Sequence, residues 1–222
     1  MNDKRIEAED LRAMLGYTCR RIQEEESNLN ALDAAVGDGD HGITMRIGFQ
    51  AIQGSLDATP REATLTDVLR EAGKAFMGAT GGAIGIIFGR MFIGGGTALA
   101  GVKEIGPVEF KTMLEAMEAS VVKAGKAQPG DKTLLDSLHT ACESLNSQPP
   151  CRSLAEAASR AADAAEEGAQ STAEMHCRLG RGSRLGDRVI GHRDPGAVSF
   201  SLVLRSMAEW VNAMDSASAP KV

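Results

Sequence analysis

The sequence predicts an all-helical protein. Apolar residues recur at helical spacing along nearly the whole chain, and the alternation typical of strands does not appear. With 222 residues and 43% hydrophobic content, the chain can bury a sizeable core. We therefore expect a single domain over residues 1–222 with about eight helices. The tail after about residue 214, DSASAPKV, is expected to fray.

The first helices are expected from apolar spacing. One contains Leu11, Met14, Leu15, Thr18 and Ile22, and another contains Leu65, Val68, Leu69, Ala72 and Phe76. Segment 75–89, AFMGATGGAIGIIFG, carries no charge and has repeated GxxxG spacings. It is shorter than the roughly 20 residues that cross a bilayer. We therefore expect a closely packed glycine-rich helix or loop in the core, and no membrane span.

The later helices also have start signals. Gly106 and Pro107 open one of them. Asp131 is placed to cap the next, which contains Leu134, Leu135, Leu138 and Leu145. Ser153 and Glu156 form a capping box before an alanine-rich helix. The last expected helix has a cap and a proline at its first position, Asp194 and Pro195, and continues through Trp210.

The charge balance and the cysteines exclude several classes of protein. The chain has 24 basic and 30 acidic side chains and a net charge of -6, which disfavours binding to a nucleic-acid backbone. The four cysteines form no CxxC pair, and the segment MNDKRIEAEDL lacks the apolar core of a signal peptide. These features predict a reduced, cytoplasmic protein.

Three aspartates lie close together in LDAAVGDGDHG at 32–42: Asp33, Asp38 and Asp40. A glycine-rich loop can turn their carboxylates toward one point, where they would repel each other unless a hard divalent cation such as magnesium lay between them. A calcium EF-hand is excluded because Phe49 stands where its glutamate belongs. The alternative is a water-exposed helix-capping turn, and this stays open.

Three other glycine-rich joints are candidate binding loops. GKAQPGDKT at 125–133 is no P-loop, because Asp131 stands in place of the lysine, but it can still line a ligand site. The segment GATGGAIG suits either a phosphate cradle or close helix packing. The joint GRGSRLGDRVIGHRDPGA at 180–197 is either a phosphate site or a solvated basic loop, and its arginines are Arg181, Arg184, Arg188 and Arg193. The spacing assigns no role to His41 or His192.

Together the motifs at 32–42, 81–85 (GGAIG), 125–133 and 180–197 resemble the nucleotide-binding L subunit of dihydroxyacetone kinase, over almost the whole chain. The resemblance implies a barrel of eight antiparallel helices with the nucleotide at one end. It also implies that two Mg²⁺ ions are held by the catalytic carboxylates Asp33, Asp38 and Asp40.

The nucleotide contacts are implied by the same resemblance. They are His41, Gly42, Ile43, Thr44, Gly82, Ala83, Ile84, Gly125, Leu134, Arg181, Asp194, Pro195 and Gly196. In that arrangement Gly125 and Leu134 lie near the adenine. The chain departs from the family at Ile84, where serine is usual, at Arg184, where an aromatic residue is frequent, and at Leu134, where methionine is frequent.

The implied activity, with ADP or ATP as the magnesium-bound nucleotide cofactor, is transfer of the terminal phosphoryl group of the nucleoside triphosphate to dihydroxyacetone or a related short ketose such as erythrulose. The ketose would be held covalently by a histidine of a separate K subunit, without which this chain would be inactive. The phosphoryl donor is either ATP, slightly favoured because Ile84 lacks the hydroxyl that serine would bring to the phosphate site, or a phosphotransferase-system protein that rephosphorylates bound ADP.

Whether the chain forms a homodimer stays open. The alternative function is a regulatory binding module that contacts a transcription regulator and has little catalytic role.

Overall fold

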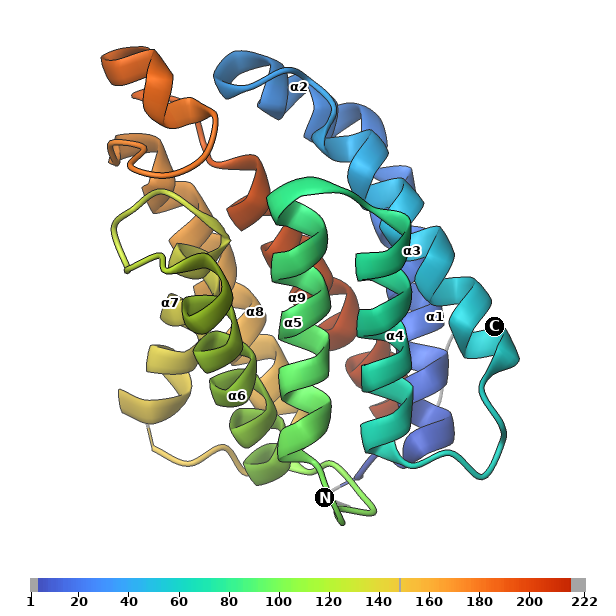
Figure 1. Ribbon diagram of the computed structural model, residues 1–222. Helices are drawn as coiled ribbons and strands as arrows, with labels where there is room; N and C mark the ends of the chain where they lie inside the picture. The colour runs from blue at the N-terminus through green and yellow to red at the C-terminus, as the bar shows by residue number, and fades with distance from the viewer. Residues whose placement is uncertain (1–3, 148, 217–222) are drawn as a thin grey trace.

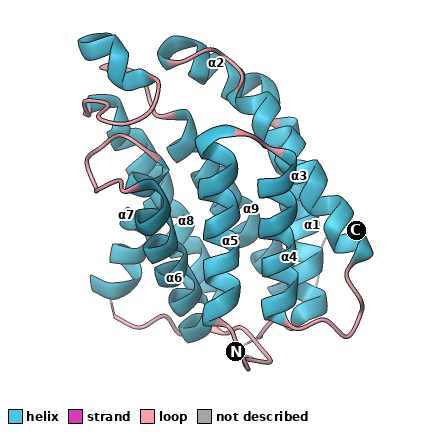
Figure 2. Cartoon of the chain, viewed as in Figure 1, coloured by secondary structure: helices cyan, strands magenta, loops and turns pink. Residues whose placement is uncertain are grey.

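The structure, a computed structural model, describes residues 4–147 and 149–216. Within these ranges every regular element is a helix (Figure 2), and Ile6 pairs with Ile105 in one isolated antiparallel bridge. The prediction of an all-helical protein is confirmed. Most of the tail that was expected to fray, residues 217–222, lies outside the described residues.

The described residues form nine α-helices and two 3-10 helices. They are α1 (Ala8–Glu24), α2 (Glu26–Val36), α3 (His41–Ala58), α4 (Leu65–Ala79), α5 (Gly82–Ala98), α6 (Pro107–Gly125), α7 (Leu134–Ser147), α8 (Leu154–Ser171), η1 (Thr172–Glu174), η2 (Gly182–Val189) and α9 (Pro195–Asp215). The expected number was about eight. The difference is α2, which is separated from α1 by a bend at Glu25 (φ -91°, ψ 4°).

The helices pack in a closed circuit. Starting from α1, the order of contact is α3, α4, α5, α6, α7, α8 and α9, and α9 packs again on α1. Helix α2 contacts α3, α9 and η2. In Figure 1 the long helices lie side by side, and α2 and the orange segment that contains η2 lie together at the upper end of the molecule. That end carries the site described below.

One hydrophobic cluster joins all of the long helices of the circuit. It extends in sequence from Ile6 to Val211 and is fully enclosed at its centre. Phe49 of α3 meets Phe76 of α4 and Phe92 of α5 edge to face, with ring centroids 5.7 and 6.3 Å apart. Edge-to-face packing is a favourable aromatic geometry. The alanine-rich helix α8 joins this core through alanines, which allow α7 and α9 to approach it closely.

Glycines set the spacing between α4 and α5. A Cβ atom on Gly73 would lie 2.5 Å from the Gly89 carbonyl oxygen, and one on Gly89 would lie 2.8 Å from the Gly73 carbonyl oxygen. Both distances are too short for a real side chain, so only glycine permits this crossing. The expected close packing of the glycine-rich segment is therefore confirmed. No helix among the described residues combines the length and the apolar character that a membrane span requires.

Two of the helix starts depart from the predicted signals. Asp194 caps α9 with Pro195 in the first turn, as predicted. Ser153 caps α8, but the predicted capping box is not complete, because the Glu156 carboxylate accepts a hydrogen bond from the Arg152 amide and not from Ser153. The prediction that Asp131 caps α7 is wrong. Lys132 adopts a left-handed backbone (φ 61°) between Asp131 and the helix, and the Asp131 carboxylate instead accepts a hydrogen bond from the Gln128 amide at 2.8 Å. The Thr133 amide donates to Asp136 Oδ2 at 2.7 Å, so Asp136 serves the start of α7.

Candidate functional site

The turn between α2 and α3 gathers the three predicted carboxylates. Asp33 lies in the last turn of α2, and its Oδ2 accepts hydrogen bonds from the amides of Asp40 and His41 at 3.0 and 3.3 Å. Gly39 takes a left-handed conformation (φ 78°), which lets the chain reverse within this short turn. As a result, ligand oxygens of Asp33, Asp38 and Asp40 lie within 4.8 Å of one another.

This cluster has the chemistry of a divalent-cation site. Carboxylate oxygens are the ligands that magnesium prefers, and the three groups are close enough to share a cation. The Arg181 guanidinium forms an ion pair with Asp38 and lies 3.5 Å from Asp40. Partial withdrawal from water and the charge of Asp38 raise the pKa of Asp40, while Arg181 opposes that rise. The cluster therefore concentrates negative charge that a cation would relieve.

The predicted capping turn is present in the same residues. Asp33 caps α3, while Asp38 and Asp40 are about half exposed and make no cap contact with the helix start. One carboxylate oxygen of Asp33 thus fixes the turn. This arrangement keeps the other two carboxylates at the molecular surface, where a partner molecule can reach them.

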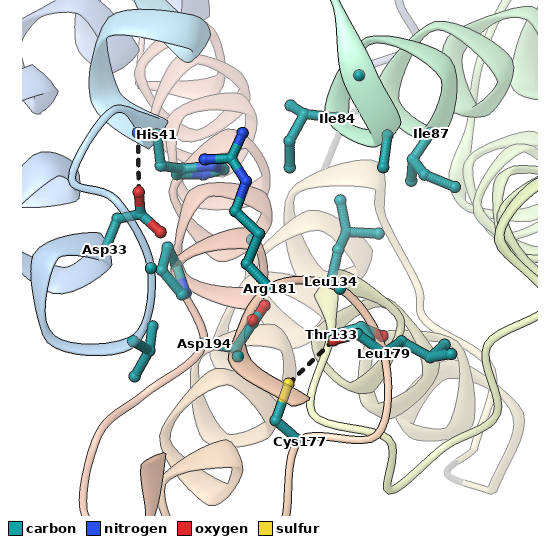
Figure 3. Close-up of a pocket in the computed structure, with 18 of the residues that line it drawn as sticks. Asp33, His41, Ile84, Ile87, Thr133, Leu134, Cys177, Leu179, Arg181 and Asp194 are labelled. Atoms are coloured by element: carbon teal, nitrogen blue, oxygen red, sulfur yellow. Dashed lines mark hydrogen bonds between the residues drawn. The ribbon is translucent and has the colours of Figure 1, made fainter. Parts of the chain in front are cut away.

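A cavity of about 670 Å³ opens beside the carboxylates. It is bordered by the α2–α3 turn, the start of α5, the end of α6 with the loop that follows it, the segment around residue 180, and the start of α9. Figure 3 shows Asp33 and His41 on one side and Ile84 and Ile87 on the other, with the Arg181 side chain between them. A volume of this size is typical of small-molecule sites.

The cavity unites most of the residues that were predicted to bind nucleotide. Its lining includes Asp33, Asp38, Asp40, His41, Thr44, Gly82, Ala83, Ile84, Gly125, Leu134, Arg181, Asp194, Pro195 and Gly196. Gly42 and Ile43 are not in the lining. A Cβ on Gly42 would meet the Glu26 carbonyl, so this glycine permits the contact between α2 and α3, and the Ile43 amide donates to Asn30 Oδ1 at 3.1 Å.

Helix N-termini converge on the cavity. The first residues of α3, α5, α7 and α9 all line it: His41, Gly82, Leu134 and Pro195. In α3 the first amide donates to Asp33, and in α9 the Ala197 amide donates to Asp194. The α5 N-cap is Gly81, which has no side chain to bond the α5 amides. Since these amides carry partial positive charge, the start of α5 is well suited to a phosphate group.

Part of the cavity wall is apolar. Ile84, Ile87, Val121, Leu134, Leu135 and Leu179 form this part. Ile84 and Ile87 also pack against the hydrophobic core, which fixes their position. The cavity therefore combines charged groups, suited to phosphate and cation, with apolar side chains suited to a flat ring such as a nucleobase.

The arginines of the 180–197 segment do not act as one group. Arg181 lines the cavity, whereas Arg184, Arg188 and Arg193 are absent from the lining. Arg184 and Arg188 are exposed on η2. Of the two alternatives for this segment, the solvated basic loop describes Arg184 and Arg188, because the irregular path of η2, with a left-handed Gly186 (φ 57°), directs them to solvent, while Arg181 alone lies at the cavity.

His41 is held as a buried neutral group. Its Nε2 lies 3.1 Å from Ser199 Oγ, and burial lowers its pKa to about 4, although Asp33 and the Pro195 carbonyl favour the charged form. At neutral pH the ring is therefore uncharged. It shapes the wall beside the carboxylates and adds no positive charge to the site.

Sequence reasoning missed Lys132, Cys177 and Leu179, which also line the cavity. Cys177 and Leu179 precede the glycine-rich motif and belong to no recognisable pattern. Lys132 lies within a quoted motif, but a lysine in a glycine-rich loop is ordinarily exposed, whereas this side chain is buried. The sequence holds no signal for this burial, because it depends on the left-handed backbone of Lys132 (φ 61°), which the sequence does not reveal.

The fold and the cavity define a helical protein with a small-molecule-sized cavity beside a cluster of three carboxylates. The chain belongs to the DAK2 domain family, whose match extends over residues 35–209.

Curated relatives cover most of the chain. The ADP-binding subunit DhaL of PEP-dependent dihydroxyacetone kinase 2 of Listeria innocua is 36% identical over 192 residues, which is 85% of this chain and 88% of that protein. The corresponding DhaL subunit of Escherichia coli K12 is also 36% identical, over 86% of this chain and 91% of its own length. Human triokinase/FMN cyclase is 34% identical, but the match is to 34% of its length.

Solved structures share the fold. The native dihydroxyacetone kinase of C. freundii superposes with a TM-score of 0.70 and 27% identity, covering 89% of this chain and 34% of that one. The same kinase in complex with AMP-PNP and Mg²⁺ gives a TM-score of 0.68 and 26% identity. This chain therefore spans about a third of the length of the C. freundii kinase.

Proposed function

We propose that this chain is the nucleotide-binding subunit of a dihydroxyacetone-type kinase, which transfers a phosphoryl group from a magnesium-bound nucleotide to a short ketose. The observation that carries the proposal is the cavity, which places three carboxylates beside the uncapped start of α5. The relatives named as ADP-binding subunits, and the C. freundii kinase bound to AMP-PNP and Mg²⁺, support the same function.

In this proposal Asp33, Asp38 and Asp40 hold two Mg²⁺ ions. When bound, the ions would neutralise phosphate oxygens and so stabilise the charge that develops during phosphoryl transfer. The side chains of the protein position the reactants. Asp33 fixes the turn through its bonds to the α3 amides, and Asp38 and Asp40 face outward at the mouth.

The nucleotide would lie along the cavity with its phosphates beside the charged groups. The amides of Gly82, Ala83 and Ile84 would meet the phosphates at the start of α5, which needs no side-chain hydroxyl at position 84. Arg181 would contact a phosphate, Gly125 and Leu134 would border the adenine, and Asp194, Pro195 and Gly196 would form the far wall. His41 and Thr44 would face the phosphates, and Gly42 and Ile43, in the same first turn of α3, would support them through their contacts with α2.

In this proposal the fold is a barrel of eight antiparallel helices that binds the nucleotide at one end. Support comes from the closed circuit of contacts and from the N-termini of α3, α5, α7 and α9, which are alternate members of the circuit and all line one cavity. A single domain is supported by the one continuous core. The nucleotide then lies at one end of the barrel, where a second protein can approach its phosphates.

The ketose would be carried by a separate K subunit, covalently on a histidine. Two observations support a partner of this kind. Relatives of about this length are named as subunits, and this chain matches about a third of the C. freundii kinase, which leaves most of that kinase without a counterpart here. The chain should therefore be inactive alone. A cytoplasmic location remains a prediction from the sequence.

The phosphoryl donor separates two versions of the proposal. Relatives that match along most of their length are named PEP-dependent, which supports ADP that stays bound and is rephosphorylated in place by a donor protein of the phosphotransferase system. Exchange of ATP from solution is the other version. Retention of ADP through purification and dialysis would favour the first, and rapid exchange would favour the second. The comparisons do not favour a purely regulatory module.

Reconstitution tests the proposal. Mixed with a K-type subunit, dihydroxyacetone and either ATP or a phosphoenolpyruvate-driven donor system, the wild-type chain should form the ketose phosphate. Asp38→Asn should abolish the reaction while the helical circular-dichroism spectrum is retained. If wild-type chain gives no product with either donor, although its partner is active with another nucleotide-binding subunit, the proposal is wrong.

A further inference from the structure

Residues 173–191, which we call the strap, lead from η1 through η2 toward the start of α9 and border the cavity. The strap brings Cys177, Leu179, Gly180, Arg181 and Gly182 to the cavity lining. Most of its residues from Arg178 to Arg188 are exposed and packed in 3-10 turns instead of a long helix. Such a segment has few buried contacts of its own, so its position depends on how its two ends are anchored.

Both ends of the strap are bonded by one side chain, Lys132. The Lys132 Nζ donates hydrogen bonds to the carbonyl of Thr172, which precedes the strap, at 2.5 Å and to the carbonyl of His192, which follows it, at 2.6 Å. Lys132 is only 2% exposed. A buried ammonium is costly unless it is bonded, so these two carbonyls are strong partners for it.

Other contacts close the base of the strap at the same place. The Gly191 amide donates to the Ala173 carbonyl at 2.8 Å, and the Asp194 amide donates to Thr172 Oγ1 at 2.9 Å. These bonds join the two ends to each other. Lys132 is different because it belongs to the loop before α7 and thus joins the base of the strap to another part of the cavity wall.

The loop that carries Lys132 is itself held firmly. The Asp136 carboxylate accepts hydrogen bonds from the amides of Gly130 and Thr133 at 2.5 and 2.7 Å. Lys132 has a left-handed backbone (φ 61°), which is uncommon for a residue with a side chain and directs this lysine inward. Burial lowers the pKa of Lys132, and the negative charge of Asp194 acts in the opposite direction.

We propose that Lys132 is a positioning residue that holds the strap over the nucleotide by bonding both ends of the strap through one ammonium group. The inference rests on the proposed function for the identity of the ligand, but not for the bonds that hold the strap. With Lys132 in place, Arg181 and Leu179 stay at the cavity. Without it, the strap would open more often and the nucleotide would leave faster.

Limited trypsin digestion of the nucleotide-free protein tests the anchoring directly. The strap carries exposed cleavage sites at Arg178, Arg184 and Arg188. Lys132→Met removes the ammonium and keeps a long apolar side chain, so cleavage in the strap should become about tenfold faster, as expected for the loss of charged hydrogen bonds. Lys126→Met is the matched control, because Lys126 is in the same loop, also has a left-handed backbone (φ 56°), and is exposed.

The second readout is nucleotide release. With Mg²⁺ and a fluorescent ADP analogue, Lys132→Met should increase the dissociation rate by about tenfold with little change in the association rate, since an open strap admits ADP as readily as before. Lys126→Met should match wild type in both assays. Thermal unfolding of each variant shows whether the rest of the molecule is intact, and strap cleavage must precede cleavage elsewhere.

The outcomes separate the two proposals. If wild-type chain binds ADP, but Lys132→Met matches it in strap cleavage and ADP release, Lys132 does not position the strap and the proposed function stands. If wild-type chain does not bind ADP, the proposed function fails, and digestion alone still decides whether Lys132 anchors the strap. If Lys132→Met does not fold, Lys132→Leu, which also removes the ammonium and every N–H donor of the side chain, replaces it in both assays under the same criteria.

Discussion

The Asp33 carboxylate has two roles, one in capping α3 and one in the carboxylate cluster. It caps the helix through the amides of Asp40 and His41, and it also lies within the carboxylate cluster. The side chains of Asp38 and Asp40 make no such cap contact, and Arg181 offsets only part of their mutual repulsion, since the pKa of Asp40 is still raised. This contrast between the three aspartates supports a cation-binding role for the outer pair.

Asp38→Asn and Asp40→Asn should each lower magnesium-dependent ADP affinity by at least about tenfold, because a charged ligand is worth more than 1.4 kcal/mol to a bound divalent cation. Thermal stability without ligand should change little, since each substitution removes repulsion among the carboxylates together with an exposed ion pair to Arg181. Calorimetric titration measures the affinity. Asp57→Asn, an exposed aspartate at the far end of α3, is the control and should bind ADP as wild type does. Unchanged affinity in both site variants would exclude the cluster as a metal site.

His41 should titrate far below a solvent-exposed histidine. Burial lowers its pKa to about 4 from the ordinary 6.5. As the pH falls through this range, the unfolded chain takes up the proton first, so His41 reduces folding stability progressively below about pH 6.5. An NMR titration of the histidine ring signals, with His41 assigned through His41→Gln, measures the midpoint. A midpoint near 6.5 would mean that the ring is hydrated and the cavity wall is open.

At the scale of single residues, the sequence predicts that the aspartates and glycines of the turns lie at the cavity, because turns require residues of these types. The sequence pattern does not tell which residues of a helix turn toward the cavity. His41 and Thr44 are three apart and share one face of α3, whereas Gly42 and Ile43 rotate away from the cavity. Lys132 is missed because its burial depends on carbonyls that lie 40 and 60 residues further along the chain.

Helix elements were predicted where apolar spacing and start signals agreed, as in α6, α8 and α9. The separate helix α2 was not foreseen, since the bend at Glu25 involves no glycine or proline. The start of α7 was misjudged because the left-handed Lys132 comes between Asp131 and the helix. Local conformations of non-glycine residues outside the usual regions are set by tertiary contacts, which a sequence pattern does not contain.

Close packing along α3 gives a test at the element scale. A Cβ on Gly48 would collide with the Phe76 ring, while one on Gly54 of the same helix meets nothing within 4 Å. Gly48→Ala should therefore lower the free energy of unfolding by about 1–3 kcal/mol. Gly54→Ala should leave it unchanged or raise it by up to about 1 kcal/mol, because alanine is the better helix former. Urea unfolding measures both, and equal effects would contradict the packing of α3 on α4.

At the scale of the whole molecule, the circuit of helices explains why the site forms at one end. The N-termini of α3, α5, α7 and α9 meet there, and the elements that carry them lie far apart in sequence. The four glycine-rich joints contain much of the site but do not reveal that they share one cavity. Only the resemblance to a known family predicted that the four joints lie together, and residues from all four joints line the one cavity.

The central claim is that the cavity binds a nucleotide together with magnesium at the three carboxylates. The most direct test is a calorimetric titration of nucleotide-stripped wild-type chain with ADP, with and without Mg²⁺. We predict about one ADP per chain and strong dependence on the cation, since the phosphates would otherwise face the charges of Asp33, Asp38 and Asp40. Absence of binding in both conditions, or binding indifferent to magnesium, would contradict the claim.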